Sequence, residues 1–243
     1  MSQAPAGLQS LTRTCRSPKA LAKELGKARA MANMLATQSA EMRAKGEGRE
    51  LTTARWGMPS SSKALMDATK KRAAKLQAKG KAVDFKELLR MEPDGGTTNI
   101  RNVNSKHWTR WLETENRCVV PFNSFSEFNK AEGGDIWFAL DETRPLACFA
   151  GIWTNWTSVR KVKEGETTND LFAFLTTEPN AEVGAIHSKA MPVILTTPEE
   201  VETWMSAPPD EALKLQRPLP DGALRIVACG VKEDPPVVIP TTG

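Results

Sequence analysis

Two runs of strand composition, Leu171–Thr176 and Met191–Leu195, bracket a short polar segment that holds His187. This residue is one of only two histidines in the chain, and the unperturbed pKa of histidine suits proton transfer near neutrality. A rigid scaffold often presents its chemistry on a loop between buried strands. The pattern therefore makes His187 a candidate acid or base, and a structural histidine is the alternative.

The remaining apolar runs do not alternate regularly with helical segments. Residues 136–140 and 146–153 are strongly apolar and predict a hairpin of buried strands, whereas residues 156–170 are charged and predict a long exposed loop. Because strands and helices are not interleaved in a βαβ pattern, we expect an α+β fold around a curved, mostly antiparallel sheet, with helices at its periphery.

Composition excludes several classes of protein. No apolar run approaches the roughly 18 residues needed to cross a bilayer, and no charged-then-apolar leader is present, so we expect a cytoplasmic protein without a membrane partner. The four cysteines are far apart and form no CxxC pair, so we expect neither a disulfide framework nor a metal site. The chain has no GxGxxG, Walker, HExxH or GxSxG motif and implies no cofactor.

Changes in amino-acid composition along the chain suggest three parts. Residues 1–47 are rich in Ala, Met and Lys and predict a helical segment, with a helix from about Pro18 to Arg43. Residues 48–232 form the main domain, with a basic helical insertion at about 60–92, and residues 233–243 are a Pro-rich tail. Within the insertion, residues 63–81 carry seven Lys and Arg against Asp67. Such a run can track a phosphate backbone, or it can be a solvated helix face.

Glu127 is a second candidate for proton transfer. It lies in RCVVPFNSFSEF (117–128), where bulky aromatic rings alternate with small polar side chains. Desolvation beside such rings raises the pKa of a carboxyl group toward a value useful in acid–base chemistry. An exposed carboxylate, or one satisfied by a partner, is the alternative.

Five separated motifs occur in one order along the chain: WGMP (56–59), TNIRN (98–102), RCVVPFNSFSEF (117–128), FAGIW (149–153) and AIHSKAMPVIL (185–195). In these motifs the chain resembles the SOS response-associated peptidase (SRAP) family, also described as abasic-site processing proteins. The resemblance runs from about residue 48 to 232. It implies a compact, barrel-like α+β domain that binds abasic sites in single-stranded DNA, acts as a monomer and needs no cofactor.

The resemblance also assigns roles to individual residues. His187 matches the family's histidine, which acts as acid and base in opening the sugar ring and forming an imine. Glu127 matches the glutamate that stabilises the opened sugar, and Asn99 the asparagine that hydrogen-bonds at the lesion. Arg101 matches a phosphate-contacting arginine, and Lys189 stands where the family often has an arginine.

The chain departs from the family at its beginning. The family's mature chain starts with a cysteine, whose amine and thiol trap the sugar aldehyde in a covalent DNA–protein crosslink, whereas Ser2 follows the first methionine here. The oxygen analogue of that ring should form less readily and reverse more easily. Three explanations are open: a misassigned start codon, a divergent terminus that keeps only lesion binding or amine-driven strand cleavage, or processing that makes Cys15 terminal.

Two other classes compete with this hypothesis. A non-catalytic single-strand binding module would use the basic helices and the aromatic residues. A cysteine peptidase would take the family name literally, although none of the four cysteines lies beside a recognisable peptidase signature.

Overall fold

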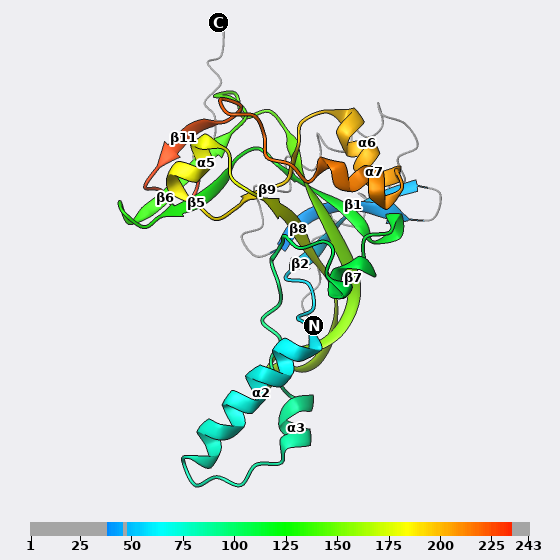
Figure 1. Cartoon of the computed structure of the whole chain (residues 1–243), viewed down its shortest axis with the longest axis vertical. Coiled ribbons are helices and arrows are strands. Elements are labelled where there is room, and N and C mark those ends of the chain that lie inside the picture. Colours follow the sequence, from blue (N-terminus) through cyan, green and yellow to red (C-terminus); the bar gives the residue numbers. More distant parts are fainter. Residues whose placement is uncertain (1–37, 46–47, 235–243) are drawn as a thin grey trace, which may run out of the picture.

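The computed structural model describes residues 38–45 and 48–234. It confirms an α+β fold with two mostly antiparallel sheets and peripheral helices (Figure 1). The Ser2 terminus, Cys15 and most of the Pro-rich tail lie outside the described residues.

The larger sheet has the strand order β10-β7-β4-β1-β2-β8-β3, β9 pairs with β8, and β8 also pairs with β7. Only the short pairings of β8 with β2 and with β3 are parallel. The strands of this sheet are β1 (Gln38–Lys45), β2 (Gly48–Trp56), β3 (Asn99–Ile100), β4 (Arg117–Phe122), β7 (Ala147–Lys161), β8 (Gly165–Thr177), β9 (Met191–Pro192) and β10 (Ile194–Leu195).

The smaller sheet has the order β11-β6-β5 and is antiparallel throughout. Its strands are β5 (Phe125–Asn129), β6 (Gly134–Ala139) and β11 (Arg225–Cys229). Only two residues separate the end of β4 from the start of β5, so the chain passes directly from one sheet to the other.

The helices lie at the periphery and begin at residues suited to cap them. Ser61, Asp84, Asn180 and Thr197 each accept a hydrogen bond from a backbone N–H of the first turn that follows. The α-helices are α2 (Ser62–Gln77), α3 (Phe85–Arg90), α4 (Lys106–Thr109), α5 (Ala181–Ile186), α6 (Pro198–Ser206) and α7 (Pro209–Ala212), and the 3-10 helices are η1 (Thr114–Asn116), η2 (Val162–Glu164) and η3 (Leu213–Leu215).

Two hydrophobic clusters cover opposite sides of the central strands. Strand β4 is buried at all six positions: Val119 belongs to the cluster around Trp204, whereas Cys118 and Val120 belong to the cluster rich in phenylalanine. Alternate side chains of a strand point to opposite faces, so β4 lies between the two clusters. The Trp204 indole donates to the carbonyl of Cys118, which joins α6 to this strand.

The expected helix over residues 18–43 is wrong where the structure describes it. Gln38–Lys45 is strand β1, which lies between β2 and β4. Its residues favour helices locally, but pairing on both edges overrides that weak preference. The buried Arg43 side chain is fixed by carboxylates of Glu50 and Asp170. The rest of that helix lies outside the described residues.

Two further expectations for residues 136–170 are wrong. Strands β6 and β7 do not form a hairpin, because β6 pairs in the small sheet and β7 in the large one. Residues 156–170 are not a loop either, because β7 and β8 continue as a two-stranded ribbon around η2. Polar cross-strand pairs stabilise the ribbon, such as the hydroxyls of Thr157 and Thr168 at 2.7 Å.

The basic segment over residues 60–92 contains helices α2 and α3. These two helices lie against each other and project away from both sheets (Figure 1).

Candidate functional site

His187 and Glu127 lie in contact although sixty residues separate them in sequence. Asn180 caps α5, and His187 ends that helix with its amide donating to the carbonyl of Val183 at 2.7 Å. The imidazole Nδ1 lies 3.0 Å from Glu127 Oε2 on β5. Nδ1 makes no well-aligned hydrogen bond, so a small rotation of the ring would be needed to direct its N–H at the carboxylate.

Burial raises the pKa of Glu127 above its ordinary value, and the nearby His187 imidazole opposes that rise. The direction agrees with the sequence prediction, because desolvation disfavours the charged carboxylate. A carboxyl group with a raised pKa can hold or release a proton more readily near neutral pH. Beside an imidazole, it forms a pair suited to moving one proton.

Glu127 and Asn99 line the same hollow, whose volume is about 500 Å³. The walls are aromatic and apolar with few polar groups, as is typical of small-molecule sites. The lining residues are Trp56, Asn99, Phe125, Ser126, Glu127, Trp137, Phe149, Phe174, Thr176, Ala190, Met191 and Pro192. The structure therefore brings His187, Glu127 and Asn99 together, with His187 contacting the hollow's carboxylate.

Strand β3 places Asn99 at the hollow by pairing with β8, where Asn99 lies opposite Phe174. Ile100 is buried in the core and Asn99 is exposed, as expected for alternating strand residues. Next to it, the Trp56 ring stacks on Phe174 at a centroid distance of 5.2 Å, and its indole donates to the carbonyl of Thr98 at 3.1 Å.

Arg101 and Lys189 lie beside the segment that carries His187, and both are exposed. The Arg101 guanidinium donates to the carbonyl of Lys189 and lies 3.2 Å from the carboxylate of Glu178. Neither residue lines the hollow. They place two positive charges next to the site rather than inside it.

The sequence did not single out Trp56 and Phe174 as site residues. Trp56 lies in the WGMP motif and is 45% exposed, which is unusual for a tryptophan at the end of a core strand. The available signal in the sequence was the position of this tryptophan directly before Gly57 and Pro59, which mark a turn.

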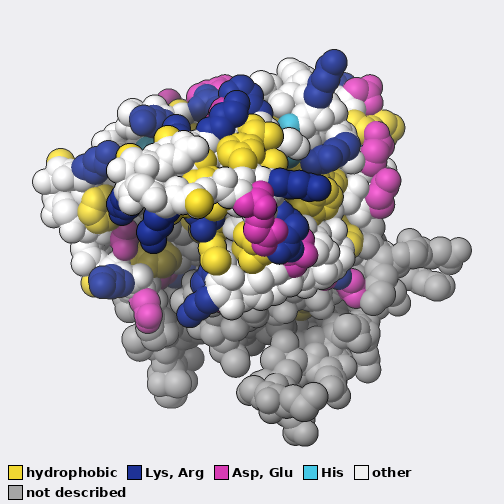
Figure 2. All heavy atoms as spheres, turned by 90° about the horizontal axis from the view of Figure 1, so that it is seen from below, with side chains coloured by type: hydrophobic (Ala, Val, Ile, Leu, Met, Phe, Trp, Pro, Cys, Tyr) yellow, Lys and Arg dark blue, Asp and Glu magenta, His cyan; other side chains and the backbone are white. Residues whose placement is uncertain are grey.

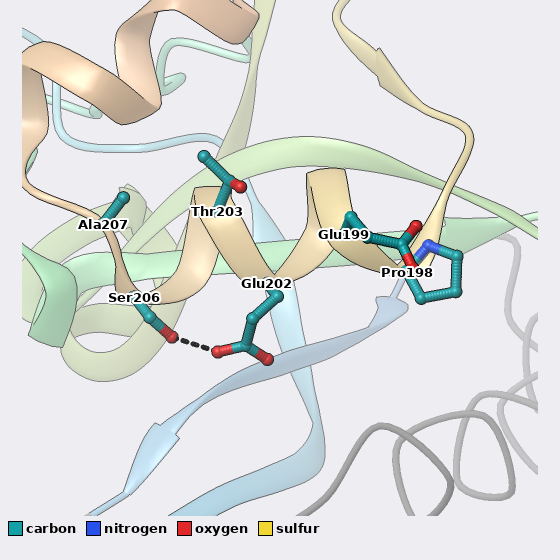
Figure 3. Close-up of a pocket in the computed structure, with 6 residues that line it drawn as sticks. All are labelled: Pro198, Glu199, Glu202, Thr203, Ser206 and Ala207. Atoms are coloured by element: carbon teal, nitrogen blue, oxygen red, sulfur yellow. Dashed lines mark hydrogen bonds between the residues drawn. The ribbon is translucent and has the colours of Figure 1, made fainter.

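A second hollow, on the surface of α6, does not carry comparable chemistry (Figure 3). It is lined by α6 itself and the residue that follows. Its Glu202 carboxylate is held by Arg49, at 2.7 and 2.9 Å, and by the Ser206 hydroxyl. These contacts fix the end of α6 to β2.

Thiol chemistry has little support in the described part of the chain. Cys118 and Cys148 are buried, and burial raises the pKa of the Cys148 thiol to about 12. Cys229 is exposed on β11. Among the residues that the structure describes, no three His, Cys, Asp or Glu side chains gather to hold a metal ion, and no helix is long and apolar enough to span a membrane.

Fold and site together define a class: an α+β protein with a half-buried imidazole–carboxylate pair beside an aromatic hollow. The model of the SOS response associated peptidase (SRAP) family matches residues 5–232, and the chain belongs to this family. The match begins well before residue 48, where the motif resemblance begins. Membership supports a role related to DNA damage.

One solved structure agrees with this fold. The crystal structure of a protein from Bacteroides thetaiotaomicron is similar at 21% identity and a TM-score of 0.50, covering 77% of this chain and 72% of that one. A protein from Bordetella bronchiseptica is 20% identical, covering 77% of this chain and 82% of that one, with a TM-score of 0.48. No curated protein matches the sequence at a significant level.

Proposed function

We propose that this protein recognises abasic sites in single-stranded DNA and catalyses opening of the lesion's sugar ring. An abasic sugar is a cyclic hemiacetal, and opening it moves a proton from the anomeric hydroxyl to the ring oxygen. One group must accept the first proton while another donates the second. An adjacent imidazole and carboxyl group supply both functions.

The observation that carries the proposal is the 3.0 Å contact between His187 Nδ1 and Glu127 Oε2 at the edge of a hollow that Asn99 also lines. The aldehyde produced by ring opening is the form that an amine attacks to give an imine. In this scheme the Asn99 amide orients the opened sugar by hydrogen bonding. Arg101 and Lys189 contact the flanking phosphates, which fixes the strand without reading its sequence.

The later chemistry depends on which residue is the mature terminus. A terminal amine can form an imine with the aldehyde, with loss of water. If Ser2 is that residue, ring closure through its hydroxyl would give the oxygen analogue of the family's crosslink, which reverses more easily. We therefore assign lesion binding and ring opening to the described residues of this chain.

Binding measurements test the recognition step. The full chain is titrated with two fluorescent single-stranded oligonucleotides that differ only in one abasic position. We expect tighter binding to the abasic strand, and we expect the preference to shrink in Asn99→Ala and in Glu127→Gln. Lys106→Gln, an exposed lysine on α4, serves as the control and should keep the preference.

Equal affinity of the unmodified protein for the two strands would contradict the proposal. That result would instead fit a non-catalytic single-strand binding module, which grips backbone and bases without regard to the lesion.

A further inference from the structure

The projecting helices α2 and α3 form an arm, defined here as residues 62–91. The arm carries nine Lys and Arg residues against three Asp and Glu, a net charge of +6, whereas the whole chain has +4. Residues 1–47 carry a further net charge of +5, so the arm is one of two basic segments, and the remainder of the chain is acidic. Figure 2 looks onto the end of the molecule from which the arm projects and shows Lys and Arg side chains spread over it.

One row of these charges is free to bind a partner. Lys71, Lys75 and Lys79 follow one another at four-residue intervals, the first two on α2 and Lys79 in the turn directly after it, and all three are exposed. Residues four apart lie on the same side of a helix, about 6 Å apart along its axis. No ion pair engages them among the described residues, in contrast to Lys63, which is 2.6 Å from Asp67.

The arm is anchored beside the candidate site. The segments that lead into and out of the arm meet where Met58 and Thr97 exchange backbone hydrogen bonds of 2.9 and 2.8 Å. Trp56 and Asn99, which line the hollow, each lie two residues from this bridge. The buried Arg160 fixes the same point by donating to the carbonyl of Gly57 at 2.7 Å. The arm therefore extends from the rim of the site as an anchored projection.

We propose that the arm binds the phosphate backbone of a DNA duplex next to the single-stranded lesion. The proposal rests on the proposed function, because it assigns the neighbourhood of the same site. Helix α2 has 16 residues and is about 24 Å long, the length of roughly seven base pairs.

The chemistry of the arm favours a duplex over other polyanions. Duplex DNA presents one negative charge per about 1.7 Å of axis, and unpaired lysines bind it without reading sequence. Single strands are gripped by stacking on aromatic side chains. In the arm, Phe85 is the single aromatic residue, and it is 37% exposed. Helices that lie on a membrane carry a broad apolar face, and α2 exposes Lys, Ala and Gln instead.

The test compares the dependence of binding on salt for two probes. One probe is an abasic single strand joined to a 12-base-pair duplex, and the other is the same strand without the duplex. The variant Lys71→Gln/Lys75→Gln/Lys79→Gln should lower the slope of log K against log salt by about three on the first probe only. Between 50 and 200 mM salt, the unmodified protein should then lose about 40-fold more affinity than the variant.

The control variant is Lys106→Gln/Lys130→Gln/Lys232→Gln. It removes the same charge from exposed residues on α4, in the turn after β5 and in the segment after β11, and should keep the steep slope. Glutamine retains the helix propensity of lysine, and unchanged thermal unfolding verifies that both variants fold. An unchanged slope in the arm variant, or an equal loss on the single strand alone, would overturn the proposal.

Two further measurements separate the alternatives. On a probe with an intact nucleotide in place of the abasic site, the arm should contribute the same salt dependence of binding. Equal affinity for the abasic and intact probes would contradict the proposed function and leave the result for the arm separate. Vesicles rich in phosphatidylserine should not bind the protein. Vesicle binding that the arm variant abolishes would assign the arm to a membrane and overturn the proposal.

Discussion

Arg160 is the residue whose removal should most disturb the junction between the arm and the site. It lies on β7, and its side chain is only 2% exposed. The guanidinium donates to the backbone carbonyls of Gly57, at 2.7 Å, and Asp94, at 3.1 Å. Its Nη1 also lies 3.8 Å from the Asp94 carboxylate, which is 3% exposed.

The loss of stability expected for Arg160→Met follows from the polar groups that it leaves without a partner. Two backbone carbonyls lose their donor, and a buried acceptor without a partner costs about 1–3 kcal/mol. The Asp94 carboxylate loses its cation, although the amides of Ser60 and Gly96 still donate to it. Removing one partner of a buried pair typically costs about 3–5 kcal/mol, and we expect a loss in that range. This is a large fraction of the roughly 5–15 kcal/mol that stabilises a domain.

Urea unfolding of four variants measures this effect. Arg160→Met and Asp94→Asn are made singly and together, and Arg90→Met is the control. Arg90 is exposed and pairs with Glu87 across one helical turn, so its replacement should cost less than about 1 kcal/mol. The double variant leaves no unpaired charge and should lose at least about 1 kcal/mol less than the sum of the single losses. A loss below 1 kcal/mol for Arg160→Met, or strict additivity, would refute this reasoning.

Three other changes test separate parts of the structure. Because burial raises the folded-state pKa of Glu127, its contribution to stability is lost as pH rises; Glu127→Gln should unfold at higher temperature than the unmodified protein at pH 8, with no advantage at pH 3.5. Gly96→Ala should lower stability by more than Gly80→Ala in urea unfolding: both residues have positive φ, but a Cβ at Gly96 would lie 2.8 Å from Arg160 Nη2, whereas nothing lies within 4 Å at Gly80. For protein whose intact mass verifies Ser2 as the first residue, abasic single-stranded DNA should give no adduct that survives heating and denaturing electrophoresis, and such an adduct would disprove the role given to Ser2.

Much of the core could be predicted because apolar runs specify buried strands. The runs at 146–153 and 171–176 lie in the first half of β7 and the second half of β8. Their partners could not be predicted from the runs. Residues 141–146 carry the chain from one sheet to the other, and Arg144 adopts a φ of +52° there, with its guanidinium on Asp234. That long-range contact has no local signal.

Strands without apolar runs were missed for a related reason. In the outer part of the β7–β8 ribbon most side chains are polar or charged, so its composition is that of a loop, although Val159 and Arg160 are buried there. Strand β1 is specified by its two neighbours rather than by its own residues.

For the site, the direction of the Glu127 pKa shift was predictable, because the aromatic-rich stretch around this residue implied burial, and burial raises its pKa in the fold. Its contact with His187 depends on two sheets and α5 meeting in space, and residue types alone do not encode that distance. The roles of Asn99, Arg101 and Lys189 stay predictions from family resemblance.

Borohydride trapping tests most directly whether His187, Glu127 and Asn99 act together on an abasic sugar. The reagent reduces an imine between protein and sugar to a stable amine, which electrophoresis detects. We predict trapping of abasic single-stranded DNA by the unmodified chain, slowed about 100-fold or more in His187→Gln and reduced in Glu127→Gln and Asn99→Ala. Absence of any trapped product, or an unchanged rate in His187→Gln, would contradict the account.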